Sequence, residues 1–194
     1  VTNKQPSSRW YSGSGIYRDV TLSYRDKVQV AENGNHITTP KLAEQKDGNV
    51  ETQIQSKIKN TAKTLAKVFV EQQIFTKEGK AVSDLVRSVT KSLSGNETAD
   101  FKQTILVNKP TLWTTKSYHP QLYVLKTKVY KEGQLVDVTE DTFGYRYFNW
   151  TAKEGFSLNG ERMKFHGVSI HHDNGALGAE ENYKATYRKL KLLK

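Results

Sequence analysis

The segment NVETQIQSKI, residues 49–58, alternates between two kinds of side chain. Val50, Ile54 and Ile58 fall on one face, together with the small polar residues Thr52 and Ser56. The positions between them are all polar or charged. Successive side chains of a β-strand point to opposite faces, so this period of two is the pattern of a strand with one face buried. The segment therefore predicts a half-buried strand.

The same alternation recurs through the middle of the chain. The inward-facing sets are expected at Ala66, Val68, Val70 and Ile74, at Phe101, Gln103, Ile105 and Val107, and at Tyr123, Leu125, Thr127 and Val129. Gly79 lies in a turn that leads into residues 82–93, and KEGQ turns the chain into residues 135–147. About seven strands fall within residues 25–148, with short turns and no helical window between them. They predict a mainly β fold, an immunoglobulin-like antiparallel β-sandwich of two sheets.

The flanks of this region differ from it. Residues 16–22 predict a strand that has no partner strand nearby. The segment FSLNGERMKF, residues 156–165, predicts a compact hairpin with Asn159 and Gly160 at a type I′ turn. A short strand at residues 167–170 and the loop HHDNGALG follow.

A helix is predicted after this loop. Glu180 and Glu181 are placed in its first turn and basic residues near its end, which is the arrangement that the helix dipole favours. Tyr183, Tyr187 and Leu190 follow a helical spacing and form one apolar stripe. A strand, a polar loop and a helix make one β/α unit, whereas a parallel barrel needs eight. The sequence therefore predicts one unit of an incomplete TIM barrel.

Composition excludes several classes of function. The net charge is +10, but only seven of the 30 basic residues are Arg and the lysines are spread along the chain, which argues against a nucleic-acid partner. With no Cys, disulfides and thiolate chemistry are excluded. No window is apolar enough for a membrane-spanning helix, so no membrane partner is expected. The compartment stays open between the cytoplasm, the cell surface and secretion.

Three stretches in order resemble one family. SRWYSGSGIYRDVTL resembles the end of the N-terminal sugar-binding jelly roll of family 2 glycoside hydrolases, and DVTEDTFGYR resembles the last strand of their immunoglobulin-like second domain. FSLNGERMKFHGVSIHHDNGALGA resembles the start of their catalytic (β/α)8 barrel, and its residues are most similar to those of the bacterial β-galactosidases. The resemblance implies a jelly-roll remnant at residues 1–24, the sandwich at 25–148 and the start of the barrel at 149–194.

This resemblance implies a retaining glycosidase with two catalytic glutamates, one acting as nucleophile and one as acid/base. In the family both belong to later barrel strands, beyond residue 194, so the chain is expected to be an inactive scaffold fragment of a β-galactosidase. The alternative is a free-standing immunoglobulin-like adhesion or carbohydrate-binding module. The acidic residues of the hairpin and helix, interpreted as solvated charges, are Glu132, Asp137, Glu140, Asp141, Glu180 and Glu181.

The loop after the predicted barrel strand holds the candidate substrate-binding residues. By resemblance, His171, His172 and Asp173 would face the sugar in the intact enzyme; the other interpretation is a polar turn that caps the following helix. Adjacent residues cannot easily supply three tetrahedral zinc ligands, and His166 lies too far back along the strand. No metal and no cofactor are expected.

Aromatic residues near the predicted boundaries are interpreted as interdomain packing. The aromatic residues are Trp10, Tyr17, Trp113 and Trp150, and Arg18 is expected to bond across the same boundary. Trp10, Tyr11 and Tyr17 could instead form a platform on which a sugar stacks. The expected partners are the rest of the parent enzyme, a β-galactoside bound only by the intact protein, and possibly further copies in a homo-oligomer.

Overall fold

The computed structural model describes residues 15–16, 18–116, 120–171, 174–178 and 180–193. The chain divides into two compact units. One unit is Arg25–Lys164, and the other combines residues 1–24 with Phe165–Lys194.

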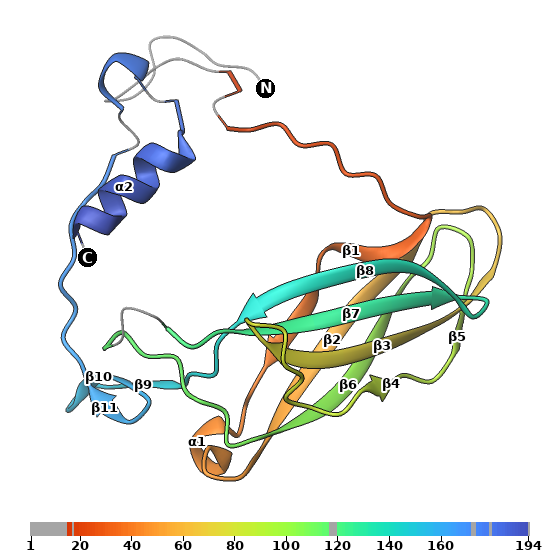
Figure 1. Cartoon of the computed structure of the whole chain (residues 1–194), viewed down its shortest axis with the longest axis horizontal. Coiled ribbons are helices and arrows are strands. Elements are labelled where there is room, and N and C mark those ends of the chain that lie inside the picture. The colour runs from red at the N-terminus through yellow and green to blue at the C-terminus, as the bar shows by residue number, and fades with distance from the viewer. Residues whose placement is uncertain (1–14, 17, 117–119, 172–173, 179, 194) are drawn as a thin grey trace. The chain divides into compact units, whose positions relative to one another are not determined.

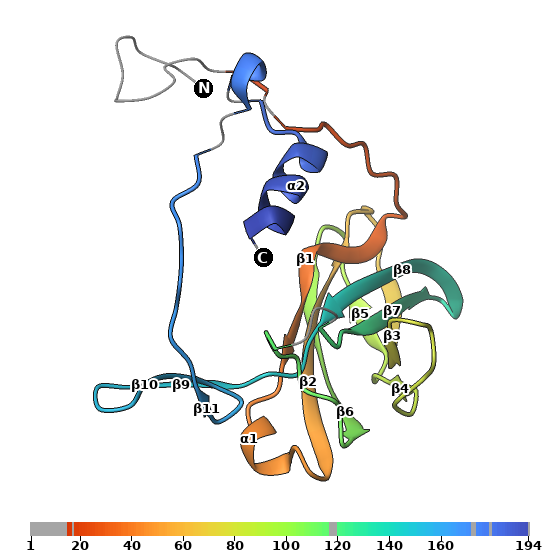
Figure 2. The ribbon, with the colours of Figure 1, turned by 60° about the vertical axis from the view of Figure 1, so that its left-hand side comes forward.

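The larger unit is built on two antiparallel sheets (Figure 1). The first has the order β1-β2-β6, formed by β1 (Val28–Thr38), β2 (Asn49–Asn60) and β6 (Thr98–Asn108). The second has the order β4-β3-β7-β8, formed by β4 (Val86–Arg87), β3 (Ala66–Thr76), β7 (Tyr123–Lys131) and β8 (Gln134–Phe143), with β5 (Lys91–Leu93) also paired to β3. Figure 2 shows the two layers on opposite sides of the sandwich. The predicted two-sheet antiparallel β-sandwich is confirmed.

The alternating patterns determine which face of each strand is buried. In β2, Val50, Ile54 and Ile58 are at most 2% exposed, and Thr52 and Ser56 on the same face are fully buried. The predicted inward positions of β3, β6 and β7 are buried as well. Removing these apolar side chains from water drives the two sheets together, by about 25 cal/mol per Å² of apolar surface.

A polar layer divides the interior into two apolar clusters. One cluster includes Val28 and Ile58, and the other includes Ile54 and Tyr145. Ser56 on β2, Gln72 on β3 and Thr127 on β7 are buried polar residues, and each lies along its strand between residues of the two clusters. The Gln72 amide Nε2 donates to the hydroxyl oxygens of both Ser56 and Thr127 at 2.9 Å. A buried polar network of this kind fixes the register of the facing strands, since a slip would leave its members unpaired.

Two local features of the sandwich differ from the sequence prediction. The region 82–93 forms two short strands, β4 and β5, because each pairs with a different part of β3. A one-turn helix, α1 (Leu42–Gln45), lies within the region predicted to have no helix. Leu42 is only 1% exposed and belongs to the second apolar cluster, so tertiary packing holds a turn that is too short to give a periodic signal.

The predicted hairpin is confirmed as part of a small sheet of order β11-β10-β9. Its strands are β9 (Phe148–Thr151), β10 (Gly155–Leu158) and β11 (Glu161–Arg162). Asn159 and Gly160 connect β10 to β11 with φ values of 52° and 83°, as the type I′ turn requires. The sheet lies within the Arg25–Lys164 unit.

The smaller unit contains the helix but not the predicted strands. Helix α2 (Tyr183–Leu193) and a short 3₁₀ turn, η1 (Gly175–Leu177), are present. The strands predicted at residues 16–22 and 167–170 are wrong for the residues that are described, since these segments have no strand pairing. A strand exists only when a neighbour satisfies its backbone groups, and an alternating pattern cannot supply that neighbour. None of the helices in the described ranges is long and apolar enough to cross a membrane.

The start of α2 also differs from the prediction. Glu180 and Glu181 precede the helix, and its first turn holds no acidic residue. The side-chain oxygen of Asn182 accepts a hydrogen bond from the backbone N–H of Ala185 at 3.2 Å. Asn182 therefore provides the N-terminal cap, a position that favours Asn over a charged side chain of greater length.

Candidate functional site

Asn174 makes several hydrogen bonds in the described part of the segment between Ile170 and α2. The Asn174 amide Nδ2 donates to the carbonyl oxygen of Glu180 at 2.5 Å, and its Oδ1 accepts from the ammonium group of Lys189 at 2.9 Å. Its backbone N–H donates to the carbonyl of Gly178 at 2.9 Å. The Asn174 side chain thus connects Glu180, before the helix, to Lys189 in the second turn of the helix.

His171 lies at the start of this loop and is exposed. It lines a shallow hollow of about 160 Å³ together with Ile170, Glu181, Thr186, Lys189 and Leu190. The Thr186 hydroxyl donates to the carboxylate of Glu181 at 2.7 Å. His172 and Asp173 lie outside the described residues, so the three predicted sugar-binding residues are not all placed.

The role of Asn174 could not be predicted from the local sequence pattern. The turn residues Asn and Gly around it indicated only a loop, whereas its partners Glu180 and Lys189 are brought to it by the fold of α2. Among the described residues, no three His, Asp or Glu side chains are grouped so that they could hold a metal ion.

Trp113 packs between the sandwich and the small sheet. Its backbone N–H donates to the carbonyl of Tyr145 at 2.8 Å, and its carbonyl accepts from the amide of Asn159 at 2.9 Å. The guanidinium of Arg146 lies 4.8 Å from the centre of the indole ring, as in a cation–π contact. Gly144 leaves the room that the ring occupies, because a Cβ there would lie 2.9 Å from the Cβ of Trp113.

Trp150 belongs to an exposed aromatic group on the small sheet. Its ring centre lies 5.8 Å from that of Phe156, which stacks in turn on Phe148 at 6.2 Å. Trp150 and Phe148 are 66% and 70% exposed. Arg18 is exposed in the smaller unit, while Trp10 and Tyr17 lie outside the described residues.

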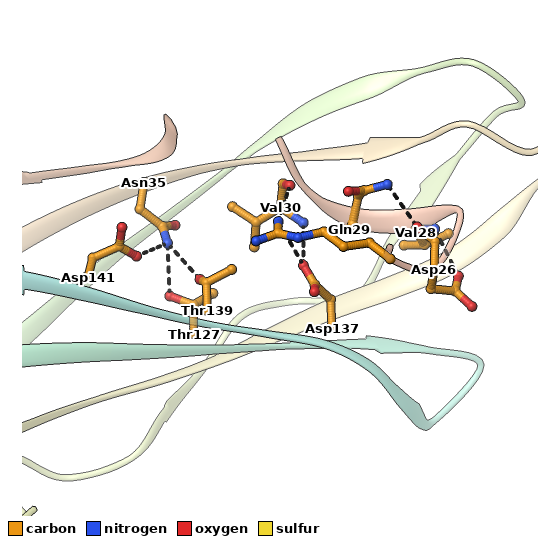
Figure 3. Close-up of polar contacts among 10 residues, drawn as sticks. Asp26, Val28, Gln29, Val30, Asn35, Thr127, Asp137, Thr139 and Asp141 are labelled. Atoms are coloured by element: carbon orange, nitrogen blue, oxygen red, sulfur yellow. Dashed lines mark hydrogen bonds and ion pairs between the residues drawn. The ribbon is translucent and has the colours of Figure 1, made fainter. Parts of the chain in front are cut away.

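Two acidic residues interpreted as solvated charges have structural roles instead. The Asp137 carboxylate, only 8% exposed, accepts from the backbone N–H of Val30 at 2.9 Å, and Arg25 lies 3.7 Å away. The Asp141 carboxylate accepts from the amide of Asn35 at 2.6 Å. Figure 3 shows both contacts crossing from β1 to β8. The solvated interpretation of Asp137 and Asp141 is therefore wrong: they join the edge strands of the two sheets.

The other hairpin acids remain at the surface. Glu140 pairs with Lys126 at 2.8 Å with its side chain 57% exposed, and Glu132 accepts from the backbone N–H of Lys67 at 2.8 Å. An exposed ion pair of this kind contributes little to stability.

Glu71 is a further acid that the sequence did not single out. It is 6% exposed and accepts two hydrogen bonds from Arg87, at 2.6 Å and 3.0 Å. Burial acts to raise the pKa of the Glu71 carboxyl, but hydrogen bonds from Arg87 and Tyr130 outweigh it and hold the pKa below its usual value. The acid is therefore a structural anion and not a proton donor near neutral pH.

Comparison with known proteins identifies the family. The protein-family model described as "Glycosyl hydrolases family 2" matches residues 34–146, which is more than half of the chain. The chain belongs to glycosyl hydrolase family 2.

Individual relatives agree with this assignment. A β-galactosidase of Bacteroides ovatus, BoGH2A, is 37% identical over 98% of this chain and 22% of its own length. A β-glucuronidase of Bacteroides fragilis is 26% identical over 84% of this chain and 23% of its own length. A crystal structure of a family 2 member from Bacteroides cellulosilyticus has a TM-score of 0.83 at 33% identity, covering 95% of this chain and 24% of that one. The chain thus spans less than a quarter of the length of these relatives.

Proposed function

We propose that this chain forms the scaffold part of a retaining β-galactosidase, in which it supports a catalytic barrel without itself supplying the catalytic glutamates. The observation that carries the proposal is the 37% identity with a protein named β-galactosidase, across both the sandwich and the loop that contains His171. Relatives named β-glucuronidase match at lower identity, for example 26%. The described acids Asp137, Asp141 and Glu71 are held by structural partners, in keeping with a supporting role.

In the intact enzyme, His171, His172 and Asp173 would contact sugar hydroxyls. Imidazole and carboxylate groups suit this task because they give directed hydrogen bonds that position a substrate. Asn174 would hold the loop against α2 through Lys189 while the residues before it face the sugar.

The aromatic residues would pack between domains. The exposed Phe148 and Trp150, with the half-buried Phe156, offer an apolar surface to the rest of the parent enzyme. Trp113, with Arg146 over its ring, would fix the angle at which the small sheet leaves the sandwich. A homo-oligomer remains an expectation.

Turnover of chromogenic substrates tests the proposal. The chain of 194 residues is expected to release no nitrophenol from a β-galactoside above the buffer rate. The longer protein from the same gene is expected to hydrolyse the β-galactoside with a kcat/KM at least about tenfold above that for the β-glucuronide, a difference of about 1.4 kcal/mol in transition-state binding. Preference for the glucuronide would refute the galactosidase assignment, and turnover by the short chain that survives repurification would refute the scaffold role.

A further inference from the structure

The outer face of the β1-β2-β6 sheet carries two rows of polar side chains. Strand register places Gln53 between Thr38 and Thr104, and it places Gln55 between His36 and Lys102. Residues two apart on a strand share a face, so both rows point the same way, opposite to the buried Ile54. These six residues are called the outer rows.

The outer rows line a hollow of about 450 Å³, together with Ile54 and Gln103, which are themselves buried. Within the described part of the chain, none of their six side chains is engaged in a hydrogen bond or an ion pair. The exposed face of the opposite sheet differs, because Lys126 pairs there with Glu140 and Arg87 with Glu71. The outer rows are thus a polar surface whose donors and acceptors are still available to a ligand.

The chemistry of these groups defines the ligand class. Amides and hydroxyls both donate and accept hydrogen bonds, which matches a molecule that carries many hydroxyl groups. The outer rows themselves contain no apolar residue, and Ile54, the apolar residue that also lines the hollow, is only 2% exposed, so a lipid is not favoured. The one Lys is too little charge for a nucleic acid.

The dimensions of the outer rows also fit such a ligand. Three strands span about 10 Å, and the two rows lie about 7 Å apart along the strands. This area accommodates a short oligosaccharide lying on the sheet.

We propose that the outer rows bind an oligosaccharide. Gln53 and Gln55, at the centre, form hydrogen bonds with ring hydroxyls, and Thr38 and Thr104 contact those at the ends of the first row. Lys102 makes the site tighter for a sugar that carries a carboxylate. This binding does not depend on hydrolysis, so it stands or falls separately from the proposed β-galactosidase activity.

Nuclear magnetic resonance titration of the 194-residue chain tests the inference. The probes are a neutral galacto-oligosaccharide and an oligosaccharide that contains uronic acid. Saturable shifts are expected at the backbone amides of residues 36–38, 53–55 and 102–104, with a dissociation constant of about 1 mM for a shallow polar site. The double variant Gln53→Ala/Gln55→Ala should weaken binding of both sugars at least about fivefold, and Lys102→Met should weaken only the acidic one.

The control is Gln134→Ala, at an exposed position on β8 of the other sheet, which should leave both affinities unchanged. Each variant must keep the dispersed spectrum of the parent, so that loss of binding is separate from loss of fold. Absence of saturation with both sugars, or equal weakening by Gln134→Ala, would overturn the inference. It would also be overturned if these amides were already protected from solvent in the longer protein without sugar, because another domain would then cover the face.

Discussion

At the residue scale, acids that look alike in the sequence have different roles. Asp137 and Asp141 join β8 to β1 through Val30 and Asn35, whereas Glu140 pairs with a lysine at the surface. Asp137 and Asp141 are four residues apart on a strand, so they share a face, and their contacts with β1 show that this face points to the interior. Glu140, next to Asp141, faces outward. This period of two was the signal that could have distinguished them, but charge alone favours a solvated interpretation.

Replacing Asn35 tests the role of this polar network. Asn35 donates to the carboxylate of Asp141 at 2.6 Å and accepts from the hydroxyl of Ser56 at 2.5 Å. Asn35→Ala removes a hydrogen bond from each of these partly buried partners. We therefore expect a loss of about 2–4 kcal/mol in the free energy of unfolding. Urea denaturation followed by circular dichroism gives the value. Glu32→Ala, at an exposed position of the same strand, should change stability by less than about 0.5 kcal/mol; equal effects would show that the network contributes nothing.

At the element scale, β1 is interrupted by a bulge that sets these contacts. Its pairing with β2 shifts between Val30 and Asn35, and Asn33 within the bulge has a φ of 50°. The bulge brings Val30 and Asn35 into contact with different residues of β8. A strand that bends in this way joins the edges of two sheets without continuous backbone pairing.

Gly34 makes the bulge possible. A Cβ at this position would lie 2.7 Å from the carbonyl oxygen of Ala31 and 3.0 Å from that of Lys57, and neither backbone atom can move freely. Gly34→Ala is therefore expected to lower the free energy of unfolding by about 2–3 kcal/mol. The matched control is Gly48→Ala, where the nearest atom lies 3.8 Å away. Thermal melting of both variants measures the difference in stability. A Gly34→Ala variant as stable as the control would show that the bulge can shift to make room for the added Cβ.

At the scale of the whole molecule, the two units differ in what they bury. The sandwich contains two apolar clusters, whereas α2 has no buried residue among those described. Tyr183, Tyr187 and Leu190, the predicted stripe, are each more than half exposed in this chain. The sandwich thus has a core of its own, as an independently stable domain requires.

Amide hydrogen exchange should differ between the two units. Amides of β2, β3, β6 and β7 are expected to exchange at least about 100-fold more slowly than those of α2, because helix opening exposes little buried apolar surface. Mass spectrometry of peptic fragments measures both in one experiment. The β9-β10-β11 sheet, which has few buried residues, serves as an internal reference of intermediate protection. Equal protection of α2 and the sandwich strands would contradict this division.

Local sequence patterns are sufficient to predict the sandwich, the type I′ hairpin and the helix, because each depends on a local period or a local turn preference. They also identified the family through three short motifs. The three-dimensional fold adds that Asp137 and Asp141 join the sheets and that Asn174 binds Glu180 and Lys189. It also shows that the described residues within 16–22 and 167–170 lack strand pairing. Hydrogen-bond partners distant in sequence create each of these features, and a local pattern contains no information about which partner the fold will bring near.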